Sequence, residues 1–205
     1  MLNDVWYNLS DRVLFLTRNT FDQAPPSPAV YAWYYPLRIS TYDLSEFLNE
    51  VMLVMTYDAS CQNTISMSAT LRTAWRKFGL ELLALPKVEP IPNSFQETWD
   101  AACENRFDTL RQDLMRLSLF MPPLYIGKTN SLARRIREHI DGQLPGKGFH
   151  DRFERFAKEN HLSQGTVADL LCVAITSPTE DSSDDYVKLV EYIMKALAGP
   201  GFSMV

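Results

Sequence analysis

Tyr125, Arg135 and His139 lie within one fifteen-residue stretch that combines side chains able to bind and process an anion. The stretch begins with a short apolar run that ends at Gly127, and it continues with helical periodicity. An α-helix turns 100° per residue, so Arg135 and His139, four positions apart, lie side by side on one helix face. A guanidinium group offers two parallel donors that match the oxygens of a phosphate. The stretch therefore predicts a site for a phosphate-bearing ligand.

The helix that we expect at 131–140 must hold this pair against a sheet. Its apolar stripe is formed by Leu132, Ile136 and Ile140. Arg135 and His139 lie at the edge of that stripe, whereas Arg134 and Arg137 point to the opposite side. Arg135 is therefore the arginine placed to reach over the neighbouring strand.

Basic residues are concentrated around this helix. The chain has a net charge of −5, but residues 128–158 contain eight basic and four acidic side chains and carry +4, which leaves −9 elsewhere. A basic segment in an acidic chain is typical of one face that meets an anion. We expect Gly127, Lys128, Asn130, Arg134, Arg152 and Arg155 to contact substrate phosphates. Alternatively, Lys128 and Asn130 cap and solvate the turn. Arg152 and Arg155 have the alternative of forming the solvated polar face of a short helix.

The order Tyr125-Ile126-Gly127, then Arg135 and His139, resembles the second half of the GIY-YIG nuclease motif. The first half matches Val30-Tyr31, with Ala29 where the family usually has glycine. The metal-binding glutamate of that family lies in a late helix after the third strand. Glu191 is the matching residue here.

This resemblance implies a catalytic set of Tyr31, Tyr125, Arg135, His139 and Glu191. Arg135 would stabilise the charge that develops on the phosphate. Glu191 would hold Mg²⁺, for which Mn²⁺ is a substitute. Tyr31 would take the proton from the attacking water, yet only about one phenol in a thousand is ionised at neutral pH. We therefore expect neighbours such as Lys128 or Arg135 to favour its phenolate.

The function implied by the resemblance is that of a metal-dependent endonuclease, a hydrolase of DNA phosphodiester bonds of the restriction or phage-defence type. DNA is the expected partner. Two alternatives remain open from the sequence. One is a catalytically inactive, nuclease-fold module that binds nucleic acid. The other is an adaptor within a protein complex, because the insertion at 42–118 is as well suited to a homodimer contact or a partner protein as to DNA.

The elements that position these residues predict an α+β fold. We expect strands at 29–37, 122–129 and 170–178, which form a small three-stranded antiparallel sheet, with the strands of Tyr31 and Tyr125 side by side. Helices are predicted at 5–16, 131–140, 150–159 and 184–198; in the last, Tyr186, Val190, Ile193 and Leu197 are expected to face inward. Residues 1–41 and 119–205 then form a GIY-YIG-like core. Residues 42–118 form an all-helical insertion with helices near 44–55, 64–83 and 94–117.

Composition limits the class of protein. The chain has 205 residues, of which 46% are hydrophobic and 12% aromatic, so it is long and apolar enough to fold and is not disordered. Its longest apolar runs are far shorter than the roughly 20 residues of a membrane-spanning helix. The cysteines Cys61, Cys103 and Cys172 have no CxxC spacing and predict reduced thiols. With no signal-peptide pattern at the N-terminus, we expect a cytoplasmic protein.

Overall fold

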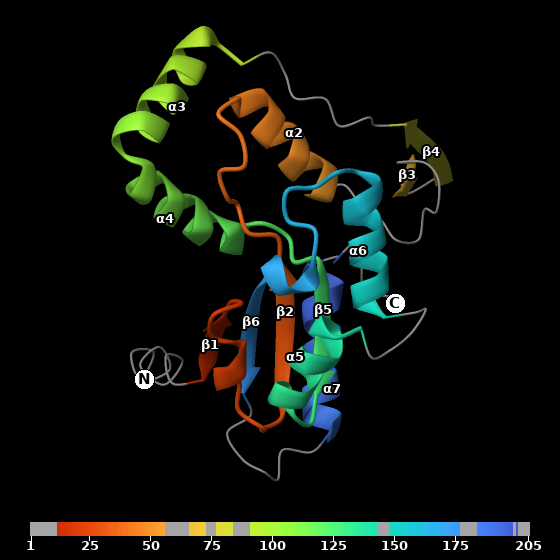
Figure 1. Ribbon diagram of the computed structural model, residues 1–205. Coiled ribbons are helices and arrows are strands. Elements are labelled where there is room, and N and C mark those ends of the chain that lie inside the picture. The colour runs from red at the N-terminus through yellow and green to blue at the C-terminus, as the bar shows by residue number, and fades with distance from the viewer. Residues whose placement is uncertain are drawn as a thin grey trace, which may run out of the picture.

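A four-stranded antiparallel sheet is the centre of the protein. The structure is a computed structural model that describes residues 12–55, 66–72, 77–83, 91–142, 148–176, 184–198 and 200. Strands lie in the order β1 (Val13–Leu16), β6 (Leu171–Thr176), β2 (Ala29–Tyr34) and β5 (Tyr125–Thr129) (Figure 1). The α+β class is confirmed. The sheet has one strand more than predicted, because residues 13–16 pair with β6 instead of forming a helix. The rest of that predicted helix, 5–11, lies outside the described residues.

Helices cover both faces of this sheet (Figure 1). On one face lie α5 (Leu132–Ile140) and α6 (Phe149–Glu159), with the short 3-10 turns η1 (Phe21–Gln23) and η3 (Val167–Asp169). On the other lies α7 (Asp184–Ala198). Successive side chains of β2 point alternately into the two layers. Tyr31 and Trp33 join the core under α5 and α6, whereas Val30 and Ala32 pack with Val187 of α7.

The insertion is mixed, not all-helical. Its helices are α2 (Leu44–Met55), α3 (Asn93–Asn105) and α4 (Phe107–Leu117), followed by the 3-10 turn η2 (Ser118–Phe120). A hairpin of β3 (Ser66–Arg72) and β4 (Lys77–Leu83) replaces the helix predicted at 64–83. The sequence SMSATLR alternates small polar and apolar residues, a period of two that favours a strand. The helix predicted at 94–117 is two helices, broken at Arg106, whose φ of −137° is not helical.

A second apolar core anchors the insertion to the end of β2. It contains Leu37 together with Phe47, Val51, Trp99, Cys103 and Leu114. The backbone N–H of Leu37 donates to Oγ of Ser118 at 2.8 Å, and that hydroxyl donates to the carbonyl of Leu114 at 3.1 Å. Ser118 is fully buried, so these bonds satisfy polar groups that water cannot reach.

Two expectations from composition can be compared with the structure. Within the described part of the chain, no helix has both the length and the apolar character that crossing a membrane requires. Cys103 and Cys172 are buried free thiols, as predicted, while Cys61 lies outside the described residues.

Candidate active site

The register of β2 against β5 brings the two halves of the motif together. Tyr31 pairs with Gly127, and Trp33 pairs with Tyr125. Tyr31 and Tyr125 are therefore diagonal neighbours on one sheet face, with ring centroids 6.1 Å apart. Gly127 leaves the space that the Tyr31 ring occupies, because a Cβ built there would lie 2.6 Å from the phenol oxygen. Two strands more than ninety residues apart thus lie side by side, as the sequence predicted.

His139 completes the cluster from α5. Its Nε2 lies 2.7 Å from the hydroxyl oxygen of Tyr31, within hydrogen-bond distance. The imidazole is only 4% exposed. Aromatic side chains surround it: the ring centroids of Tyr125, Phe149 and Trp33 lie 5.4, 5.7 and 5.9 Å from the centroid of the His139 ring. The apolar stripe of α5 fixes this position, since Leu132 and Ile136 are fully buried beneath the helix as predicted.

The environment of His139 keeps its imidazole neutral. The pKa of His139 is lowered to about 3, mainly by burial and in smaller part by the neighbouring Arg135, His150 and Arg152. His150 also lies against the same turn, with its Nδ1 2.8 Å from the carbonyl oxygen of His139. At physiological pH the ring is therefore an uncharged group, and one tautomer lets Nε2 accept the proton of Tyr31.

The phenol of Tyr31 is also neutral, which corrects the expectation of a phenolate. Burial is the main cause that raises the pKa of Tyr31 well above 10, and the neighbouring Tyr125 raises it further. The positive charge of Arg135 acts in the opposite direction but is outweighed. Tyr31 is 1% exposed, and the loss of hydration at this depth disfavours an anion more than one guanidinium favours it.

Arg135 is the cation that acts electrostatically on both Tyr31 and His139. Its Nη1 lies 2.8 Å from Oε2 of Glu138, one turn along α5. The side chain is 27% exposed, yet its Nε is buried and has no hydrogen-bond partner among the described residues. One donor of the guanidinium is thus available at the inner end of the side chain. Arg134 contacts the other oxygen of Glu138 at 3.6 Å and is 65% exposed, in agreement with its predicted outward position.

Glu191 is not joined to the Tyr31 cluster. It lies on α7, the helix that covers the opposite sheet face, and its Oε1 is 3.0 Å from Nζ of Lys195. The other nearby carboxylate, Glu138, is paired with Arg135. The described residues contain no group of three His, Cys, Asp or Glu side chains that could hold a metal ion. The predicted site needs one carboxylate, Glu191, and that carboxylate is engaged with Lys195 on the α7 face of the sheet; Mg²⁺ binding there stays a prediction.

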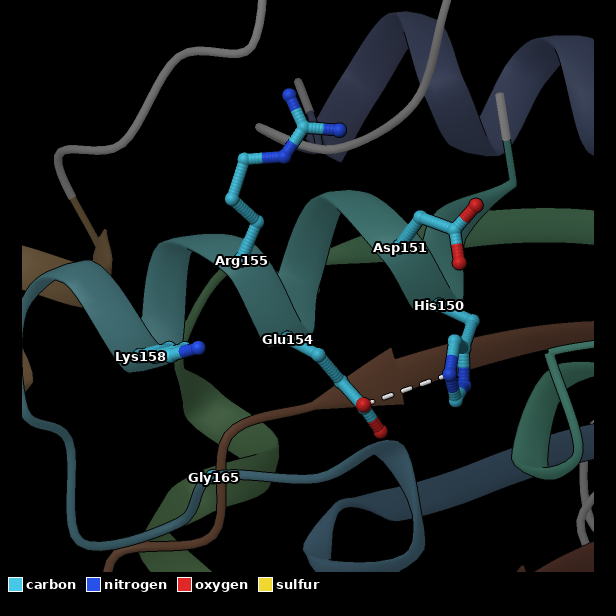
Figure 2. A pocket seen from close by; sticks show the side chains of 6 residues that line it. All are labelled: His150, Asp151, Glu154, Arg155, Lys158 and Gly165. Atoms are coloured by element: carbon cyan, nitrogen blue, oxygen red, sulfur yellow. Dashed lines mark ion pairs between the residues drawn. The ribbon is translucent and has the colours of Figure 1, made fainter. Parts of the chain in front are cut away.

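The remaining predicted phosphate contacts differ in burial and in position. Lys128 pairs with Val30, so strand alternation places it on the α7 face of the sheet, away from Tyr31. Asn130 is exposed, while Lys128 and Arg152 are half-buried. Arg155 lines a cavity of about 520 Å³ along α6, shown in Figure 2. The other lining residues are His150, Asp151, Glu154, Lys158 and Gly165. In that view Glu154 turns toward His150, with 3.4 Å between Oε2 and Nε2, whereas Arg155 extends away from them.

Sequence reasoning missed part of the wall of the site. Trp33 lies two residues after Tyr31, so the period of a strand already placed it on the same face. His150, near the start of α6, contacts the carbonyl of His139. No local pattern reveals that contact, because it depends on how α6 folds back over α5.

Comparison with known proteins returns no match: no family model, no curated protein and no solved structure matches this chain. The resemblance to GIY-YIG nucleases therefore depends on the motif residues alone and stays a prediction.

Proposed function

We propose that the chain is a DNA phosphodiesterase whose active site is the cluster of Tyr31, Tyr125, Arg135 and His139, within a GIY-YIG-like core of β2, β5, β6, α5 and α7. The observation that carries this proposal is the 2.7 Å contact between Tyr31 and His139 beside Arg135. The phenol, imidazole and guanidinium come from two elements, and Gly127 leaves room for the phenol. Together they supply a proton path and a cation for an anionic ester.

Arg135 would bind the scissile phosphate. Its guanidinium is partly exposed and already held near Tyr31 by α5, so a phosphate oxygen can replace Glu138 as its partner. A phosphate in this position gains two donors in a fixed geometry. These donors would stabilise the extra negative charge on the oxygens of the pentacoordinate transition state.

Tyr31 and His139 would move the proton of the attacking water as a pair. The raised pKa of Tyr31 disfavours a free phenolate, so the phenol must release its proton as it accepts another. In this step the water proton goes to the Tyr31 oxygen, and the Tyr31 proton goes to Nε2 of His139. The water oxygen bonds to phosphorus while the bond to the leaving oxygen breaks. The leaving oxygen takes the bonding electron pair and is protonated by solvent, which also takes up the proton of His139. His139 is neutral beforehand and so has a lone pair for this proton, but its pKa of about 3 makes it a weak base, which limits the rate of this step.

A second candidate is a nuclease-fold module that binds nucleic acid without cutting it. The position of Glu191 favours this alternative, since its carboxylate pairs with Lys195 instead of facing the cluster. The deep burial of Tyr31 also favours it, because a buried hydroxyl must be reached by substrate before it can act. Arg135 would have the same role in both candidates.

A nicking assay separates the two. Supercoiled plasmid and phage DNA, unmodified and modified, are incubated with the protein while Mg²⁺ or Mn²⁺ is titrated. Nicking that Tyr31→Phe abolishes supports the enzyme. Binding without nicking, weakened by Arg135→Ala, supports the module.

Glu191→Gln in the same assay tests the metal prediction separately. A loss of nicking in this variant would assign Glu191 to catalysis, despite its ion pair with Lys195. Lys195→Gln is the matched control, because it removes the same ion pair and leaves the carboxylate in place.

A further inference from the structure

A second concave site lies between the sheet and the insertion, away from the Tyr31 cluster. It is a cavity of about 630 Å³ bounded by the turn after β1, the segment after β2 and one side of α4. Its lining residues are Thr17, Arg18, Asn19, Arg38, Arg111, Gln112, Met115 and Arg116. Figure 1 shows two of the elements at its boundary, α4 and β1.

Four arginines from three distant segments share this cavity, and none of the described residues that line it is acidic. Two of them have acidic partners at its rim: Arg18 lies 3.6 Å from Asp169, and Arg116 lies 3.1 Å from Asp113. Both of these arginines are 72% exposed, so their ion pairs are weak and easily exchanged.

The other two arginines, Arg38 and Arg111, have no acidic partner among the described residues. Nη1 of Arg38 donates to the amide oxygen of Gln164 at 3.2 Å, a neutral partner that orients the guanidinium without neutralising it. Gln164 is itself 8% exposed, so this support is fixed within the core. Arg111 has no ion pair with any described residue. An excess of about two positive charges thus remains in a hollow of a chain whose net charge is −5.

We propose that this cavity binds a small phosphate-bearing anion of nucleotide size, such as an oligophosphate or a nucleoside triphosphate. Arginine forks match phosphate oxygens in pairs, and like charges gathered in one cavity repel one another until an anion enters. The volume lies within the range of small-ligand sites. A compact hollow with polar groups at Thr17, Asn19 and Gln112 suits such a ligand better than a long DNA backbone, which binds along an extended basic stripe.

Binding here would link the insertion to the core. Arg18 and Arg38 belong to the core segments, whereas Arg111 and Arg116 belong to α4. A ligand that contacts both sets binds the folded arrangement and not the unfolded chain, so it raises the melting temperature. This inference is independent of the proposed nuclease, because none of these arginines belongs to the Tyr31 cluster.

Calorimetric titration of the full chain with sodium tripolyphosphate and, separately, ATP tests the proposal at low salt without divalent metal. We expect saturable binding of both anions, with ATP tighter if the cavity also accepts the nucleoside. Arg111→Gln should weaken binding about tenfold, the effect of one lost charge-assisted contact. Arg38→Gln should have a similar effect.

Arg106→Gln is the matched control, because Arg106 is an exposed arginine at the start of α4 that does not line the cavity. It should bind as the wild type does. The proposal is overturned if neither anion binds, or if Arg106→Gln loses as much affinity as Arg111→Gln. Melting curves without ligand, expected to be alike for all variants, confirm that each is folded.

Discussion

The phenol oxygen of Tyr31 and Nε2 of His139 lie 2.7 Å apart, although 108 residues separate them along the chain. One comes from the central strand β2 and the other from the last turn of α5. Both groups are buried and neutral, with the pKa of Tyr31 raised and that of His139 lowered to about 3. Their pairing is therefore a hydrogen bond between uncharged partners beside one cation, Arg135.

Arg135→Ala should lower the rate of plasmid nicking by roughly 10²–10³, because it removes the donors that face the transition state. Arg137→Ala is the matched control: it deletes an exposed arginine from the same helix. First-order nicking rates at saturating protein measure both. Near-wild-type cleavage by Arg135→Ala would remove this side chain from the mechanism.

Gly127→Ala should disrupt the cluster by steric conflict. The new methyl group would lie 2.6 Å from the Tyr31 oxygen and 2.8 Å from Cε1 of Tyr125, so one ring must move. Overpacking of this kind destabilises a fold by about 1–3 kcal/mol, which urea unfolding can measure. Gly165→Ala provides the comparison, because nothing lies within 4 Å of a Cβ there. Equal stability of the two variants would contradict the close approach at Gly127.

The stability of the protein should depend on pH through His139. The unfolded imidazole binds a proton below about pH 6.5, whereas the folded one does so only near pH 3, so acid favours the unfolded chain. This contribution is complete above pH 6.5 and is lost as the pH falls toward 3, with a slope of at most about 1.4 kcal/mol per pH unit.

Urea unfolding of the wild type and of His139→Gln between pH 7 and 4 isolates that term. We expect the wild type to lose stability relative to the variant as the pH falls. NMR of the His139 ring provides a readout that does not depend on the variant's folding. A His139 ring that protonates between pH 7 and 6 would contradict the lowered pKa and the burial that causes it.

Ser118→Ala should destabilise the protein where the insertion packs against the core. The change leaves the buried N–H of Leu37 without its acceptor, a penalty of about 1–3 kcal/mol. Ser94→Ala is a suitable control, since Ser94 is exposed on α3. Chemical denaturation compares the two variants, and equal midpoints would mean that this hydroxyl does not anchor the insertion.

Local sequence determined much of the segment that carries the site. The stripe of Leu132 and Ile136, together with Arg135 and His139 four residues apart, defined α5 and the face it presents. Strand periodicity likewise placed Tyr31 and Trp33 together. These features follow from the fixed geometry of single elements, so they required no knowledge of the rest of the chain.

Other elements could not be oriented from their own pattern. On α7 the inward residues are Val187, Val190, Met194 and Ala198, whereas Leu197, predicted to face inward, is 84% exposed. Apolar residues occupy most of that helix's circumference, so its sequence does not select one face. The helix predicted at 64–83 was wrong, because β3 and β4 form a hairpin there. The sequence of β3 alternates polar and apolar residues, but a segment this short does not distinguish the period of a strand from that of a helix.

The sequence by itself determined which residue types meet, that is, two tyrosines, an arginine and a histidine on adjacent strands and one helix. Only the tertiary structure decided their chemical state. Burial makes Tyr31 and His139 neutral, and the layer in which α7 packs sets Glu191 apart with Lys195. The reason is that geometry within an element follows from local backbone periodicity, whereas hydration and charge depend on every segment packed around a group.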